Sequence, residues 1–139
     1  MADPRIAQLK RVPLFAHCGP KELAFIVTQV EDLDFPAGKE LCREGQSGGD
    51  FFIILSGSAL VTRVGKEINR LGPDDFFGEI ALLDHGPRTA TVVTTSPTRC
   101  LVLGPRQFHS VIRQQADIAT AVFAAVAARL RATGGAPAD

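Results

Sequence analysis

The chain has 139 residues, of which 45% are apolar and 22% charged, and fifteen lysine and arginine residues balance fifteen aspartate and glutamate residues. This composition is ordinary for a globular domain of one core, and the zero formal charge offers no overall basic field for nucleic acid or an anionic membrane. The longest apolar stretch, Ile118 to Ala128, is too short to span a bilayer. We therefore expect one domain with no direct membrane span and no nucleic-acid partner.

Three cysteines, at positions 18, 42 and 100, are odd in number and far apart. This pattern favours neither a disulfide framework nor a cysteine zinc site, and it indicates a cytoplasmic setting. The three histidines are also scattered, so we expect no metal. Asp3 and Pro4 stand where the apolar core of a signal peptide would begin, which excludes a secretion signal.

The first thirty residues have helical patterns. Gly19-Pro20 is typical of a helix start, because proline is favourable at the first helical position. After it, apolar side chains follow the spacing of one buried helix face, at Leu23, Ile26, Val27 and Val30. The sequence therefore predicts a helical segment over residues 1–30.

From Glu31 to residue 104 the pattern changes to short strands between turn residues, which is typical of a β-sandwich or jelly-roll barrel. We expect strands at 33–35, 39–42, 51–55, 59–64, 67–71, 91–95 and 99–103, with a hairpin turn at Gly65-Lys66. Pro105 then starts a helix, an alanine-rich helix follows from about 116 to 131, and residues 132–139 form a frayed tail.

The stretch from Phe76 to Val93 carries the candidate chemistry. Gly78 can adopt an unusual backbone angle and allow close approach of a ligand. A short helical turn over 79–83 would point free N–H groups at an anion. Arg88, followed by the hydroxyl of Thr89, suits a phosphate because the guanidinium fork matches two oxygens. Glu79 would repel a free phosphate but can accept hydrogen bonds from a ribose, so a phosphate-plus-sugar ligand explains this set best.

The run FGEIALL, followed by PRTATV, resembles the phosphate-binding cassette of cyclic-nucleotide-binding domains, and VPLF, FPAGKELCREG and FFIILSG match the same family in order. The resemblance implies an α+β, mainly β fold. Its parts would be an eight-stranded jelly-roll-like β-barrel, N-terminal helices, a short phosphate-binding helix and two C-terminal helices. One departure is Gly49, which stands where the family commonly has aspartate and implies a more flexible loop.

The resemblance also assigns roles to individual residues. The ligand site would comprise Gly78, Glu79, Ile80, Ala81, Arg88, Thr89, Val61, Leu71 and Arg129. Backbone groups of Gly78 and Ala81, with the side chains of Arg88 and Thr89, would hold the cyclic phosphate. Glu79 would bind the ribose 2′-hydroxyl.

The remaining family roles concern the base. Val61 and Leu71 would line its pocket, and Arg129 would cap it from the last helix. Read without the resemblance, Arg88 could instead form a surface salt bridge with Asp84 or Glu79, and Arg129 could be a solvated helix-end residue. We also expect Arg88 to be solvated at the pocket mouth when no ligand is bound.

Three functions are candidates for this sequence. The first is a non-enzymatic cyclic-nucleotide sensor that repositions its C-terminal helices to regulate an effector, with a potassium channel pore as the leading partner, or that acts alone on a separate protein. The second, a phosphodiesterase, lacks a metal cluster and a positioned histidine base in the sequence. The third, a transcription regulator, lacks a DNA-binding module in these residues.

The base preference stays open between cAMP and cGMP. Thr89 could reach the 2-amino group of a syn guanine, which favours cGMP. The last helix has no acidic residue between Ile118 and Arg131, so the carboxylate that some cGMP-selective members use is absent. We therefore favour cAMP as the ligand, and the resemblance implies no cofactor.

Overall fold

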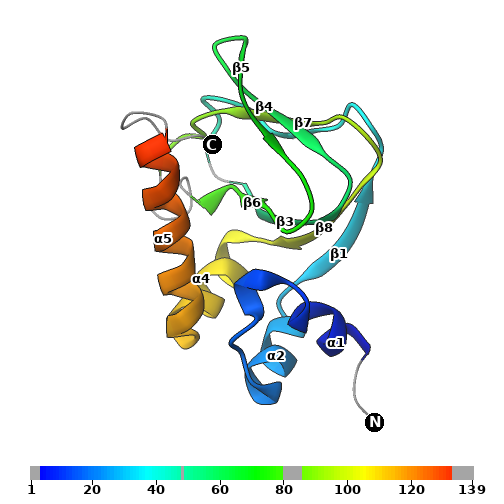
Figure 1. Ribbon diagram of the computed structural model, residues 1–139, viewed down its shortest axis with the longest axis vertical. Helices are drawn as coiled ribbons and strands as arrows, with labels where there is room; N and C mark the ends of the chain where they lie inside the picture. Colours follow the sequence, from blue (N-terminus) through cyan, green and yellow to red (C-terminus); the bar gives the residue numbers. More distant parts are fainter. Residues whose placement is uncertain (1–3, 48, 80–85, 133–139) are drawn as a thin grey trace.

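In the computed structural model, residues 4–47, 49–79 and 86–132 are described, apart from the side chains of Ala125, Arg129, Leu130 and Ala132 (Figure 1). The N-terminal segments are α1 (Pro4–Lys10), the 3-10 turn η1 (Pro13–Phe15) and α2 (Pro20–Val27). Gly19 is the N-cap of α2 and Pro20 its first residue, as the sequence predicts. Of the frayed tail predicted at 132–139, Ala132 is still part of the last helix, and residues 133–139 lie outside the described residues.

Eight strands follow within the described ranges, which confirms the mainly β fold. They are β1 (Glu31–Phe35), β2 (Glu40–Cys42), β3 (Phe51–Ser56), β4 (Ala59–Arg63), β5 (Lys66–Leu71), β6 (Phe76–Phe77), β7 (Thr91–Thr94) and β8 (Thr98–Leu103). The last elements are α4 (Pro105–Gln114) and α5 (Ala116–Ala132). The order of helices, strands and helices is the one that the sequence predicts.

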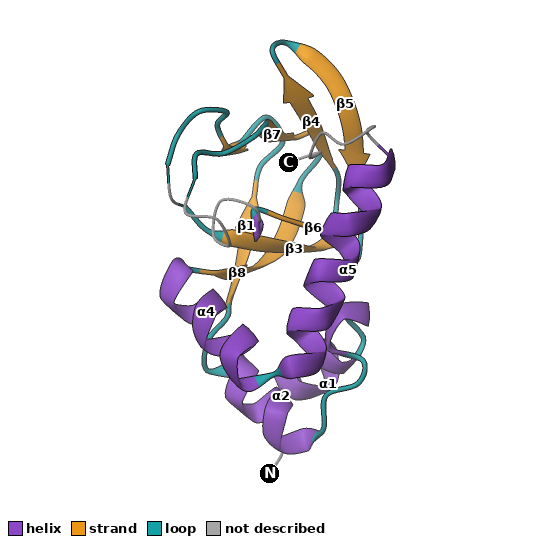
Figure 2. Ribbon diagram, turned by 90° about the vertical axis from the view of Figure 1, so that its left-hand side faces the viewer, coloured by secondary structure: helices purple, strands orange, loops and turns teal. Residues whose placement is uncertain are grey.

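The strands form two four-stranded antiparallel sheets that face each other as a jelly-roll-like sandwich. The helix-side sheet has the order β1-β8-β3-β6, and the outer sheet has the order β2-β7-β4-β5. Figure 2 shows α1, α2 and α4 gathered at one end of the strands, while α5 runs from that end alongside them. The molecule therefore has three layers: helices, helix-side sheet and outer sheet.

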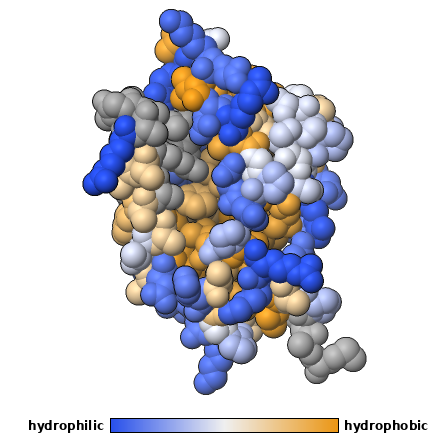
Figure 3. Space-filling view, viewed as in Figure 1, coloured by the Kyte–Doolittle hydropathy of each residue, from blue (hydrophilic) through white to orange (hydrophobic). Residues whose placement is uncertain are grey.

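The core is divided in the same way. The helical core lies between the helices and the helix-side sheet and contains Leu9, Phe15, Leu23, Ile26, Phe51, Ile53, Leu101, Leu103, Phe108, Val111, Ile118 and Val122. The barrel core lies between the two sheets and contains Cys42, Phe52, Ile54, Ala59, Val61, Leu71, Phe77, Ala90, Val92, Cys100 and Val102. Hydrophilic side chains cover the β4–β5 end in Figure 3, and apolar ones gather toward the centre of that face.

Strand β3 is shared by both cores. Phe51 and Ile53 face the helical core, and Phe52 and Ile54 face the barrel core, because successive side chains of a strand point to opposite faces. All four are at most 5% exposed. Burial on both faces explains why this segment is a continuous apolar run instead of an alternating one.

Two details differ from the sequence-based prediction. The β4–β5 turn is at Val64 and Gly65, both with positive φ (50° and 75°), and Lys66 already belongs to β5. Such paired positive angles fit the twist of a tight hairpin. The two-residue strand β6 was not predicted as a strand; it pairs with Phe52 and Ile53 of β3. No helix in the described ranges is long and apolar enough to cross a membrane.

Candidate ligand site

Arg88 is the centre of the site and is only 6% exposed. Its Nη1 donates to the carbonyl oxygen of Gly78 at 2.8 Å, and its Nη2 donates to that of Asp50 at 2.6 Å. The expectation that this side chain is solvated at a pocket mouth is therefore wrong, and Arg88 does not lie on the surface as the salt-bridge alternative requires. The physical reason is that two main-chain acceptors, distant in sequence, satisfy the buried guanidinium. Asp84, one of the two partners named for that alternative, lies outside the described residues.

Two glycines make room for this arginine. Gly78 has φ +97°, as the sequence predicts, and a Cβ there would lie 2.5 Å from the Asp50 carbonyl oxygen and 2.7 Å from Arg88 Nη1. Gly49 has φ +101°, and a Cβ there would collide with Arg88 Nη2. The glycine at the position where the family commonly has aspartate is thus where the Arg88 side chain passes against the chain. Sequence analysis identified Gly49 as a departure from the family pattern, but it did not predict the contact of Gly49 with Arg88.

The backbone of Arg88 is fixed by the loop before β3. The Arg88 N–H donates to the Gln46 carbonyl at 2.8 Å, and the Gly45 N–H donates to the Arg88 carbonyl at 2.9 Å. Ser47 and Pro87 form an isolated β-bridge beside them. An open hollow of about 130 Å³ lies against this loop, and Ser47, Gly49 and Arg88 are among the residues lining it. Backbone and side chain of Arg88 therefore both depend on residues 45–50.

Thr89 brings an arginine that sequence reasoning missed. Arg63, the last residue of β4, donates from Nε to the Thr89 carbonyl at 2.9 Å. The Thr89 hydroxyl and Arg63 Nη2 are buried, and neither has a hydrogen-bond partner within residues 4–47, 49–79 and 86–132. Strand periodicity could have found Arg63, since it lies two residues after Val61 and shares its face of β4.

Three other predicted ligand residues, Glu79, Val61 and Leu71, are buried. Glu79 is 0% exposed and directly follows Gly78. Val61 and Leu71, exposed by 1% and 6%, belong to the same barrel core as Phe77, which directly precedes Gly78. The structure thus brings the predicted base-lining residues into one core with the start of the cassette.

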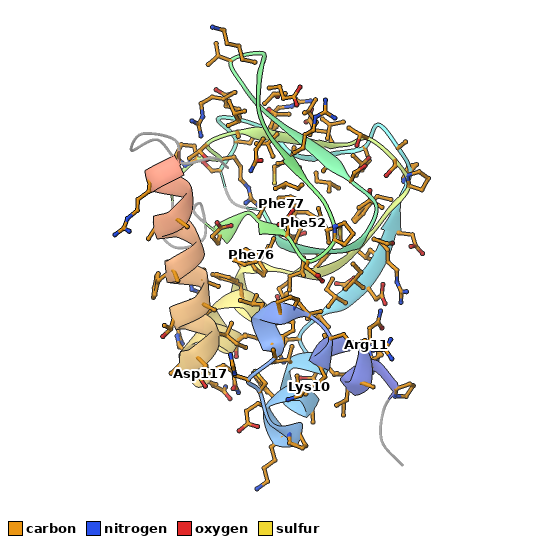
Figure 4. All side chains as sticks on the ribbon, viewed as in Figure 1. Lys10, Arg11, Phe52, Phe76, Phe77 and Asp117 are labelled. Atoms are coloured by element: carbon orange, nitrogen blue, oxygen red, sulfur yellow. The ribbon has the colours of Figure 1, made fainter. Side chains whose placement is uncertain are left out.

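A chain of rings connects the cassette to the helices. The Phe76 ring lies 5.5 Å from Phe51, and Phe51 lies 4.8 Å from Phe108 of α4. Phe77 stacks on Phe52 at 4.8 Å with an interplanar angle of 9° (Figure 4). Neighbouring residues of β6 therefore contact the helical core on one side and the barrel core on the other.

Burial also affects Asp50, whose carbonyl holds Arg88. Desolvation raises the pKa of the Asp50 carboxyl, and nearby Arg88 partly offsets the rise. The described residues contain no group of three or more histidine, cysteine, aspartate or glutamate side chains arranged to hold a metal.

Three predicted ligand residues are not placed by this geometry. Ile80 and Ala81, with the predicted short phosphate-binding helix beyond Glu79, lie outside the described residues. Arg129 lies on α5, and its side chain is not described. The ligand roles of all nine predicted residues therefore stay predictions.

Known proteins are similar to this chain in sequence and in fold. The curated relatives include the CRP-like cAMP-activated global transcriptional regulator of Mycobacterium tuberculosis, from strain CDC 1551 and from strain H37Rv, each 32% identical over 136 residues. The match covers 94% of this chain and 61% of the relative, so the chain spans about three fifths of the length of these curated relatives.

Solved structures agree with the fold. The catabolite activator protein of Thermus thermophilus has a TM-score of 0.78 at 30% identity and covers 88% of this chain and 60% of its own. A cyclic nucleotide-binding-like protein from Brucella abortus has a TM-score of 0.64 at 30% identity, with 80% of this chain and 99% of its own covered. The model of the cyclic nucleotide-binding domain matches residues 32–115, which include both sheets and the Arg88 site. With this match over more than half of its length, the chain belongs to the cyclic nucleotide-binding domain family.

Proposed function

We propose that this chain is a non-enzymatic sensor that binds cAMP at Arg88 and responds by repositioning its C-terminal helices. The supporting observation is the buried guanidinium of Arg88, oriented by the carbonyls of Gly78 and Asp50. Each terminal nitrogen carries two N–H bonds, so each keeps one after donating to its carbonyl. A cyclic phosphate would accept these remaining bonds, while the Glu79 carboxylate would accept from the ribose.

The choice of cAMP draws support from relatives. The M. tuberculosis regulator is named as cAMP-activated, and a kinase regulatory domain of similar fold, 25% identical, is named as bound to the cAMP analogue Sp-2Cl-cAMPS. cGMP is the second candidate ligand, because the Thr89 hydroxyl has no hydrogen-bond partner among the described residues and could meet a guanine amino group. We infer a cytosolic protein from its three free, buried cysteines.

Repositioning of the helices would follow the ring contacts. A shift of β6 on ligand binding would reach α4 through Phe76, Phe51 and Phe108, and α5 packs on α4. For the output, the sequence favours a potassium channel pore, and a stand-alone action on a partner protein is its alternative. The curated relatives add a transcriptional regulator as a specific candidate. The reading frames that adjoin the gene would separate these outputs.

Calorimetric titration tests the binding step. Wild type should bind cAMP, bind AMP far more weakly, and release no AMP from cAMP by chromatography. Arg88→Ala should weaken cAMP binding roughly 30-fold or more, because truncating one side of a buried charge pair costs about 2–5 kcal/mol. Arg70→Ala is the control, since Arg70 is 70% exposed and pairs with Glu67 on β5.

The same titration tests the ribose contact. 2′-Deoxy-cAMP should bind wild type more weakly than cAMP, by about 1–3 kcal/mol. The difference should nearly vanish in Glu79→Ala, whereas additive losses would show that Glu79 does not read the hydroxyl. A wild-type protein that binds no cyclic nucleotide would refute the proposed function.

A further inference from the structure

Arg63 has a buried guanidinium nitrogen, Nη2, that could donate to a ligand bound beside Thr89. It is partly buried, and Nε donates to the Thr89 carbonyl at 2.9 Å. Its Nη2 is buried and has no hydrogen-bond partner among the residues that the structure describes. A buried guanidinium nitrogen without an acceptor costs free energy, so the position of Arg63 against Thr89 needs an explanation.

The position of Arg63 on the sheet directs it toward this site. In the β4–β7 pairing, Val61 opposes Val92 and Thr62 opposes Thr91, so Arg63 continues on the inward face shared by Val61. The barrel core lies on that face. Arg63 therefore approaches Thr89 from the strand that also carries the predicted base-lining residue.

We propose that Arg63 is a second phosphate-binding arginine, which donates from Nη2 to an exocyclic oxygen of the bound cyclic phosphate. The inference rests on the proposed function. The Nε–H of Arg63 already donates to the Thr89 carbonyl, whereas Nη2 has N–H bonds left to donate. An anion that contacts both Thr89 and Arg63 could accept from Nη2. The Thr89 hydroxyl is also buried and has no hydrogen-bond partner in the described part of the chain, and this atom would face the same anion.

Charge balance gives an independent reason. In the proposed complex the Glu79 carboxylate and the cyclic phosphate would both be negative, and the buried Arg88 balances only one of these two charges. Buried charges are tolerated when they are paired. The guanidinium of Arg63 supplies the missing positive charge. A second positive charge is needed because the carboxylate of Glu79 accompanies Arg88 in the site.

The test compares Arg63→Met, which removes the charge, with Arg63→Lys, which keeps it. Arg70→Gln removes an exposed charge on the neighbouring strand as the control. Calorimetry with cAMP should show a loss of about tenfold or more for Arg63→Met, a smaller loss for Arg63→Lys and none for Arg70→Gln. Thermal melts without nucleotide report whether the Thr89 contact itself contributes to the fold.

A structural role is distinguished with the two phosphorothioate diastereomers of cAMP, in which sulfur replaces one exocyclic oxygen or the other. If Arg63 binds one of these oxygens, Arg63→Met should change the affinity ratio of the diastereomers by at least about threefold. A lost affinity with an unchanged ratio would reduce Arg63 to a positioning residue for Thr89 and overturn the proposal. So would cAMP binding by Arg63→Met within about threefold of wild type. A wild type that binds no cyclic nucleotide would instead refute the proposed function, and this inference with it.

Discussion

At the scale of single residues, the site depends on where side chains are missing as much as on where they are present. Gly49 lies against Nη2 of Arg88, and Gly78 lies against Nη1 of Arg88 and the Asp50 carbonyl. A methyl group at either position would occupy the space of the arginine. These two glycines therefore set the position of the charge that the ligand would meet.

Gly49→Ala tests this close approach, with Gly38→Ala as a matched control. Both glycines have positive φ, but a Cβ at Gly38 would meet no atom within 4 Å. Each substitution should lower the free energy of unfolding by about 1–2 kcal/mol through backbone strain. Only Gly49→Ala should also displace Arg88 and weaken cAMP binding, by about tenfold or more. Equal affinities of the two variants in calorimetry would contradict the prediction.

Cys100 should make stability depend on alkaline pH. Burial, with a smaller effect of Asp32, raises the pKa of its thiol to about 12, against 9.0 in the unfolded chain. The unfolded thiol therefore ionises first, so the native state should lose stability as the pH rises above about 9. The chain has no tyrosine to titrate in the same range.

Thermal melts across this range should show the effect. Cys100→Ala should be less stable than wild type near neutral pH, because it leaves a cavity in the barrel core. Its further loss between about pH 9 and 11 should be smaller than that of wild type. Parallel curves for the two proteins would show that another group is responsible.

At the scale of elements, α5 is anchored at one end. Ile118 and Val122 are exposed by 2% and 1% and pack in the helical core, whereas Phe123 is 55% exposed. Beyond the first half, Figures 1 and 2 show the helix continuing past α4 alongside the strands. Since isolated helices of this length are marginal in water, its second half depends on what it contacts.

Amide exchange should reveal this difference. Adding cAMP should slow exchange in residues 123–131 more than in 116–122, because the first turns are already packed. Exchange in Phe51 to Leu55 of β3 should change little. Arg129→Ala should reduce the slowing if Arg129 caps the base. Equal protection of α5 with and without cAMP would mean that this helix does not report binding.

The sequence predicts most elements because their signals are local. Gly19-Pro20 and Pro105 begin helices where proline is favourable, and the strand segments are bounded by turn residues. Strand β6 escaped prediction because two residues carry no periodicity, and its pairing with β3 is a long-range contact. The burial of Arg88 escaped for the same reason, since its acceptors lie 10 and 38 positions away in the chain.

At the scale of the whole molecule, the two cores share the helix-side sheet, but they support different parts of the protein. The barrel core includes Val61 and Leu71, the predicted base-lining residues, whereas the helical core supports α4 and α5. Adjacent residues of β3 therefore affect different parts of the protein. This division can be tested because Ile53 and Ile54 are both 0% exposed.

Ile53→Ala and Ile54→Ala should each lower the free energy of unfolding by about 2–5 kcal/mol, since each removes buried methyl groups. Ile54→Ala should also weaken cAMP binding, because its cavity opens in the core that holds Val61 and Leu71. Ile53→Ala should retain affinity and instead speed amide exchange in α4 and α5. Chemical denaturation and calorimetry measure the two effects. Equal losses of affinity would show that the cores do not act separately.

The burial of β3 on both faces affects how the register between β3 and β8 is specified. A strand that is apolar on both faces is not exposed to water by a one-residue slip, so hydrophobicity alone specifies its register weakly. Polar contacts at the corner before β8, between Gly57-Ser58 and residues 96–98, add to the specification of this register. There the buried Thr98 hydroxyl accepts from the Ser58 N–H, and its single O–H lies within hydrogen-bond distance of the carbonyls of Ser96 (2.9 Å) and Ser58 (3.1 Å). A Cβ at Gly57 would collide with the Pro97 carbonyl oxygen and the Thr98 hydroxyl oxygen. Alignment of β3 with β8, and with it the position of the Asp50 carbonyl under Arg88, is thus set by a polar corner at the far end of the strand.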